Sequence, residues 1–82
     1  MKYIRFKRVE NCRDSFVMFP RDVQHRHMRE VIGQGDINVR SAGFVRIKDD
    51  GTLECYGESV GLRTEPLPDD TEKINAYFYK QA

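Results

Sequence analysis

The sequence predicts a single α+β domain in the order ββαββα, in which a four-stranded, mostly antiparallel sheet carries both helices on one face. Four segments alternate apolar and polar residues with the period of a strand, and two have the helical period with a start signal. The length of 82 residues leaves room for one hydrophobic core, so the domain is expected to span residues 1–82. A sheet covered by one helical layer is the simplest packing of these elements.

The first two strands are predicted at residues 2–9 and 15–19. Polar residues 10–14 separate them, which is typical of a hairpin with a longer loop. Pro20 ends the second strand because proline cannot donate to a strand ladder. Alternation divides the side chains of the first strand between two faces: Ile4 and Phe6 on one, and Tyr3, Arg5 and Lys7 on the other.

A first helix is predicted over residues 23–32. Asp22 is a suitable N-cap, and Gly33 suits a left-handed C-cap. Helical spacing gathers a mostly apolar set of side chains on about half of the circumference: Val23, His27, Met28, Val31 and Ile32.

The clearest local pattern is a hairpin between residues 37–48 and 52–57. Asp49-Asp50-Gly51 reads as a three-residue turn whose glycine takes the last, left-handed position. Gly43 then lies opposite Gly57, which predicts a close backbone approach or a bulge. Folding on this turn pairs Ile47 with Leu53 and Val45 with Cys55 on one face, and Arg46 with Glu54 and Phe44 with Tyr56 on the other.

A second helix is predicted after Pro68. Asp69 is its expected N-cap, Glu72 completes a capping box, and Lys80 stands in the last turn. Residues 58–66 fit either a strand extended past a glycine bulge or a loop. The expected core side of the helix consists of Thr71, Ile74, Tyr77 and Phe78.

Charge is distributed unevenly along the chain. Residues 1–48 hold 11 Lys plus Arg and five Asp plus Glu, whereas residues 49–82 hold three and eight. This asymmetry either marks a basic surface for an anionic partner or is neutralised where the two halves pack together.

Several classes of protein are excluded by the composition. The longest apolar run has four residues, so no membrane-spanning helix is expected, and no apolar segment follows the charged N-terminus as in a signal peptide. Cys12 and Cys55 are too few and too far apart for a disulfide framework, so reduced thiols are expected. We therefore expect a cytoplasmic protein.

No catalytic or metal-binding residue is predicted, so the chain is not expected to be an enzyme or to carry a cofactor. His25 and His27 are two positions apart and would point about 160° away from each other on a helix, which prevents shared metal coordination. Residues 56–61 contain glycines without the spacing of a phosphate-binding loop. The candidate nucleophiles lack a surrounding motif: Cys12, Ser41, Cys55 and Ser59.

A binding surface is the functional feature that the sequence does predict. Aromatic and basic side chains are expected to share an open sheet face, a composition enriched at protein interfaces. A protein partner, or self-association as a homodimer, is the favoured use. The alternative is nucleic-acid binding by base stacking and phosphate contacts through the basic half. The predicted face consists of Tyr3, Arg5, Lys7, Arg40, Phe44, Arg46 and Tyr56.

Two motifs carry a family resemblance over roughly residues 16–78. Ser41-Ala42-Gly43-Phe44-Val45 and Cys55-Tyr56-Gly57-Glu58-Ser59 stand ahead of Gly61-Leu62-Arg63 and Pro-Asp-Asp-Thr-Glu. This order resembles a pattern in small bacterial and phage proteins that have no assigned activity. The resemblance implies a bacterial or viral, cytoplasmic setting and no site residues. Because short phage proteins often occupy a surface of a host protein, it favours the interaction hypothesis by analogy.

Overall fold

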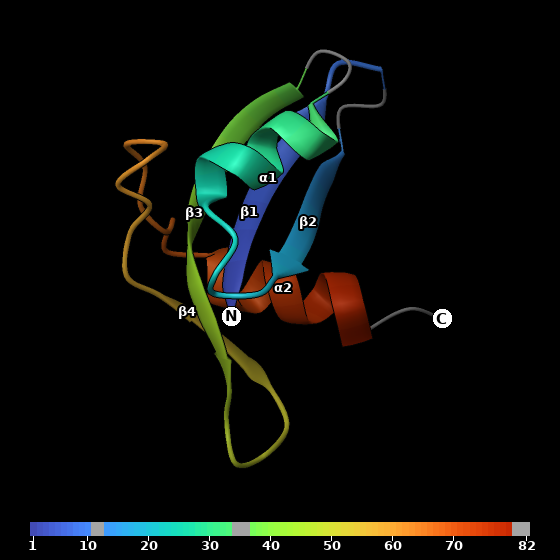
Figure 1. The fold of residues 1–82 in the computed structure, drawn as a ribbon. Helices are drawn as coiled ribbons and strands as arrows, with labels where there is room; N and C mark the ends of the chain where they lie inside the picture. Colours follow the sequence, from blue (N-terminus) through green and yellow to red (C-terminus); the bar gives the residue numbers. More distant parts are fainter. Residues whose placement is uncertain (11–12, 34–36, 80–82) are drawn as a thin grey trace.

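The computed structural model describes residues 1–10, 13–33 and 37–79. Its sheet has the order β2-β1-β3-β4, and all three strand pairs are antiparallel (Figure 1). The predicted α+β class, the ββαββα order and the four-stranded sheet are confirmed. The elements are β1 (Lys2–Arg8), β2 (Asp14–Phe19), α1 (His25–Ile32), β3 (Ile37–Ile47), β4 (Leu53–Tyr56) and α2 (Asp70–Tyr79).

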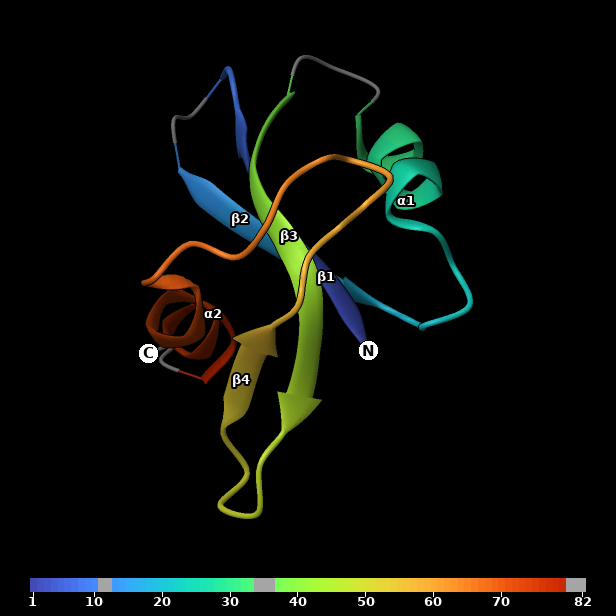
Figure 2. The same cartoon turned by 90° about the vertical axis from the view of Figure 1, so that its left-hand side faces the viewer.

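The two helices lie on opposite faces of the sheet, so their expected placement on one face is wrong. Adjacent residues of β1 point to opposite sides. Tyr3 packs with Ile74 of α2, whereas Ile4 belongs to the cluster against which Met28 of α1 packs. Figure 2 shows α2 and α1 on the two sides of the sheet. The sequence pattern suggested one open sheet face, and α2 covers much of that face.

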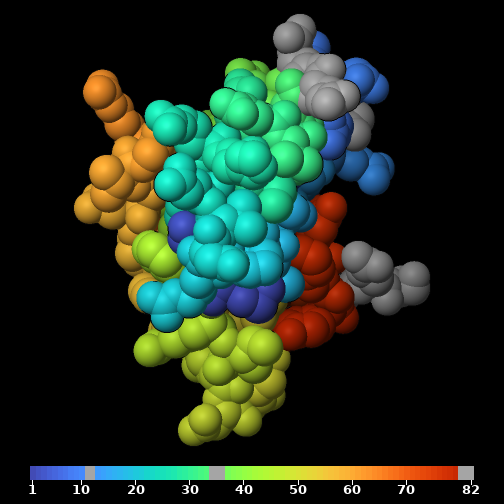
Figure 3. Space-filling model, viewed as in Figure 1, coloured from blue at the N-terminus to red at the C-terminus, as the bar shows by residue number. Residues whose placement is uncertain are grey.

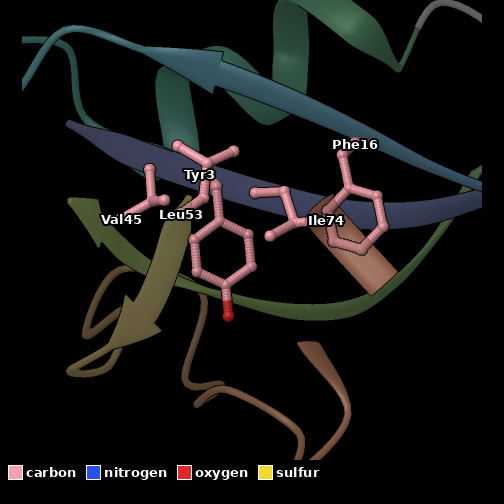
Figure 4. Packing of buried hydrophobic residues seen from close by; sticks show 5 residues of the cluster. All are labelled: Tyr3, Phe16, Val45, Leu53 and Ile74. Atoms are coloured by element: carbon pink, nitrogen blue, oxygen red, sulfur yellow. The ribbon is translucent and has the colours of Figure 1, made fainter. Parts of the chain in front are cut away.

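Each face therefore has its own hydrophobic cluster. On the α2 side, the ring of Tyr3 from β1 lies among buried residues of the other three strands and of α2 (Figure 4). That cluster consists of Tyr3, Phe16, Val45, Leu53 and Ile74. The cluster on the α1 side consists of Ile4, Phe6, Phe19, Ile37 and Ala42.

The β3–β4 hairpin has the predicted register. Phe44 pairs with Tyr56, Val45 with Cys55, Arg46 with Glu54 and Ile47 with Leu53. Gly51 in the turn has a φ of 86°, as expected for a left-handed position. The predicted close approach at Gly43 is also present, because a Cβ there would lie 2.7 Å from the carbonyl oxygen of Tyr56. Residues 58–66 form a loop with one isolated bridge between Ser59 and Thr64.

The capping of α1 differs from the prediction. Helix α1 begins at His25, and its N-cap is Gln24, so Asp22 is not the cap. Gly33 has a φ of −94° and is not left-handed. Asp69 directly precedes α2, as predicted, and its carbonyl oxygen accepts a hydrogen bond from Lys73 N at 2.9 Å, while its carboxylate accepts one from Arg5. Lys80 and Cys12 lie outside the described residues.

Helix α2 closes the outer edge of β4 with its side chains. The amide of Asn75 accepts a hydrogen bond from Leu53 N and donates one to Leu53 O, both at 2.9 Å. Thr71 Oγ1 accepts a hydrogen bond from Cys55 N at 3.0 Å. These side chains take the place of a fifth strand, so this edge is protected from pairing with other chains.

A buried ionic network joins β1 to the start of α2. Arg5 is 4% exposed, and its Nη1 donates to Asp69 Oδ1 and Asp70 Oδ1, each at 2.9 Å. It also contacts the carboxylate of Asp14 on β2. The fully buried Asp70 accepts further hydrogen bonds from the Tyr3 hydroxyl and from Leu67 N. Burial and the hydrogen bond to Asp70 raise the pKa of Tyr3, so its hydroxyl remains a donor at neutral pH.

Replacing Arg5 tests this network. Arg5→Met leaves the carboxylate of Asp70 buried without its cation, and we expect the free energy of unfolding to fall by about 3–5 kcal/mol. Tyr3→Phe removes one donor and should cost about 1–3 kcal/mol. Urea unfolding at pH 7, followed by circular dichroism, measures both.

The matched control is Glu54→Gln, which breaks the surface ion pair between Arg46 and Glu54. Exposed pairs of this kind contribute about 0–1 kcal/mol. If Arg5→Met and Tyr3→Phe cost no more than this control, the buried network does not hold α2 against β1.

Candidate functional site

The predicted binding face is divided among three places in the structure. Tyr3 and Arg5 are buried on the α2 side, so their expected exposure is wrong. Lys7 follows them on that side and is half-buried. Arg40 is exposed where the β1–β3 register shifts, and it has no partner in β1. The remaining three residues lie on the α1 side: Phe44, Arg46 and Tyr56.

The reason for this division is the register between β1 and β3. Lys2 pairs with Phe44 and Tyr3 pairs with Gly43. Phe44 therefore shares a face with the even-numbered residues of β1 and not with Tyr3. The sequence-based interpretation placed Tyr3 and Phe44 on one face of the sheet. That arrangement would require the register between β1 and β3 to shift by one residue, because such a shift exchanges the two faces.

Four residues on the α1 side form what we name the aromatic–arginine patch: Arg21, Phe44, Arg46 and Tyr56. The rings of Phe44 and Tyr56 are stacked, with centroids 5.8 Å apart and an interplanar angle of 28°. The guanidinium carbon of Arg21 lies 5.8 Å from the Phe44 centroid, and that of Arg46 lies 5.6 Å from the Tyr56 centroid. Cation–π attraction holds each arginine beside a ring.

The patch rests on a rigid support. Gly57 has a φ of 73°, and a Cβ there would lie 2.8 Å from Phe44 Cδ2, so glycine leaves space for the ring. His25 packs edge-on against Phe44, with ring centroids 5.8 Å apart. His25 Nε2 donates to the carbonyl oxygen of Gly43 at 2.7 Å, which ties α1 to β3 beneath the patch. Tyr56 is 40% exposed and presents the outer ring of the pair.

A cavity of about 580 Å³ adjoins Phe44 between the start of α1 and the loop at residues 58–61. Lys2 and Arg26 line it together with His25. Figure 3 shows this side of the molecule, with the segment around residue 60 standing beside α1 and the β3–β4 hairpin projecting below. Arg21, Lys2 and Arg26 were not predicted for the site. Lys2 falls on the same predicted strand face as Ile4 and Phe6. Arg26 lies in the predicted helix, and Arg21 lies in the connection before that helix.

The uneven charge of the chain is neutralised in part. Arg5 and Arg46 form ion pairs with carboxylates of the acidic half. Lys2, Arg21 and Arg26 surround Phe44, and Glu58 is the one carboxylate among the described residues that line the adjoining cavity. The surface around the patch therefore carries positive charge.

The candidate nucleophiles in the described residues are poorly placed for catalysis. Ser41 and Ser59 are buried, and burial raises the pKa of the Cys55 thiol to about 11. His25 is buried, whereas His27, which helical spacing placed with the apolar side chains, is exposed. Residues 1–10, 13–33 and 37–79 contain no group of three His, Cys, Asp or Glu arranged to hold a metal ion. No helix in the same ranges is long and apolar enough to cross a membrane.

Comparisons of the chain with protein-family models, with curated proteins and with solved structures find no match. The resemblance to small bacterial and phage proteins stays a prediction.

His25 makes the stability of this region sensitive to acid. Burial lowers the pKa of His25 below its usual 6.5, so the folded state keeps the imidazole neutral where the unfolded chain binds a proton. Stability is fully present above about pH 6.5 and falls as the pH drops below it. We expect the melting temperature to decrease between pH 7.5 and 5.5, and less so in His25→Gln. Equal decreases in both proteins would contradict this assignment.

Proposed function

We propose that the protein is a non-catalytic interaction module that binds a protein partner through the aromatic–arginine patch. The observation that carries the proposal is the stacked Phe44–Tyr56 pair with an arginine beside each ring. Tyrosine and arginine are enriched among the residues that dominate binding energy at interfaces. A cytoplasmic setting belongs to the same proposal, and the free thiol of Cys55 supports it.

The ring contacts favour tight binding for an entropic reason. Immobilising a flexible side chain on association costs about 0.5–1.5 kcal/mol. Arg21 and Arg46 already lie against rings, and Phe44 is fixed by Tyr56 and His25. These side chains therefore lose much of their conformational entropy during folding, so less is lost when the partner binds.

Removing the outer part of the patch tests the proposal. Phe44 contacts His25, so truncating Phe44 would disturb the core. The better variant combines Arg21→Ala and Tyr56→Ala. We expect this variant to lose binding by about 2 kcal/mol or more, roughly thirtyfold, with the melting temperature nearly unchanged. Affinity capture from an extract of the source cells, quantified against the unmodified chain, measures the loss.

The control is Val31→Ala, which shortens a side chain that is 56% exposed on α1 and lies outside the patch. Capture should survive this change. If the double variant still retains the captured proteins at the level of the control, the patch is not the binding surface.

Nucleic-acid binding is the second candidate, and the positive charge of Lys2, Arg21 and Arg26 around Phe44 favours it. Phe44 and Tyr56 already contact each other and the two arginines, which leaves less ring surface for stacking bases. For this reason we rank it below a protein partner.

Fluorescence anisotropy with labelled single-stranded DNA, duplex DNA and RNA separates the two candidates. Three phosphate contacts would make the logarithm of the affinity for duplex DNA fall with a slope of about −3 against the logarithm of the salt concentration. Our proposal predicts no such binding at low or physiological salt. A steep slope that Arg26→Glu reduces would favour nucleic acid instead.

A further inference from the structure

A groove of about 370 Å³ continues from the aromatic–arginine patch along the β3–β4 hairpin. Its walls come from the chain start, from the hairpin and from the last turn of α2. Buried Val45 and Leu53 form part of its lining, and they belong to the cluster beneath α2. The groove thus opens directly onto the hydrophobic core.

Exposed apolar side chains concentrate at this groove. The described residues contain eight large hydrophobic side chains that are exposed, and four of them line it. Ile47 is 67% exposed and Tyr79 is 56% exposed, while Met1 and Tyr56 complete the four. The gathering of large exposed apolar side chains around one groove favours it as an interaction site.

The two charged side chains that line the groove are both arginines, and Arg21 is the one of them without an ion pair among the described residues. Arg21 and Arg46 line it, and no carboxylate among the described residues does so. Arg46 forms an ion pair with Glu54, which lies outside the lining. An apolar groove with arginines beside it is complementary to an apolar side chain flanked by carboxylates.

We propose that this groove docks a short acidic segment of a partner protein, with one or two large apolar side chains in the groove and neighbouring Asp or Glu residues on Arg21 and Arg46. The inference rests on the proposed interaction function and identifies the partner chemistry. The volume lies near the lower end of about 300–1,000 Å³ for ligand cavities, which suits side-chain anchors. A nucleic acid offers phosphates but no aliphatic anchor for the groove.

Two other occupants fit less well. A symmetric dimer through this groove would put the arginines of both copies into one interface without adding a carboxylate from the groove lining, so it lacks charge complementarity. Strand addition at β4 is blocked because Asn75 and Thr71 already bond to its outer edge. At β4, therefore, side chains and not backbone pairing would hold the segment.

Selection from a displayed library of random twelve-residue peptides tests the proposal. We expect the enriched peptides to combine Leu, Ile, Phe or Trp with adjacent Asp or Glu. Synthetic fluorescein-labelled copies should bind the unmodified chain and lose at least tenfold in affinity to Ile47→Asp and to Arg21→Glu. Ile47 is mostly exposed, so Ile47→Asp should fold. Val31→Asp, which adds the same charge at a comparably exposed position on α1, should retain the affinity.

Three results would overturn the inference: no enrichment, enrichment of peptides without acidic residues, or unchanged binding by Ile47→Asp. Sedimentation that shows a dimer dissociated by Ile47→Asp would assign the groove to a second copy and also overturn it. The proposed function fails separately. If Arg21→Ala with Tyr56→Ala abolishes partner capture while Ile47→Asp and Tyr79→Ala leave it intact, the patch binds and the groove does not.

Discussion

The position of α2 depends on one buried cation. Arg5 points from the middle of β1 into the interface with α2, where water is excluded, so its charge requires carboxylates at hydrogen-bond distance. Asp69 and Asp70 supply them from the start of the helix. Buried ion pairs contribute little net stability compared with apolar packing, but leaving one partner uncompensated is expensive. We infer that the pairing selects this face and this position for α2 over alternatives that would leave Arg5 unpaired.

Placing α2 there determines which parts of the sheet remain open. The helix covers Tyr3 and Val45 on one face and bonds to the outer edge of β4 through Asn75 and Thr71. On the other face α1 has only eight residues, whereas β3 has 11. The hairpin therefore extends past the shorter helix, and this leaves Phe44 and Tyr56 partly exposed on a rigid support.

Local chemistry explains why some of this fold could be predicted. The turn Asp49-Asp50-Gly51 sets the hairpin register, and four complementary cross-strand pairs agree with it. Any other register would have mismatched these pairs, so the prediction had several independent checks. The pairing of β1 with β3 has no such local signal, because the two strands are not joined by a short turn. In addition, a bulge shifts the register of this pairing between Arg5 and Phe6. An arginine in an alternating strand is expected to face water, so the pattern could not reveal that α2 covers Arg5. Arg21, in the connection after Pro20, completes the patch only through tertiary contact.

The patch and the groove follow from the same constraint. Leu53 and Val45 face α2, but the helix runs from Asp70 near the ionic network to Tyr79, and its last turn reaches only one side of the hairpin end. Ile47 and Tyr56 then have no described element above them and stay exposed beside core residues. A shorter hairpin would leave less of this apolar surface in water and would stabilise the isolated chain. Keeping apolar side chains exposed next to ordered arginines costs solubility, and the acidic, apolar partner segment that we propose would offset that cost by covering them.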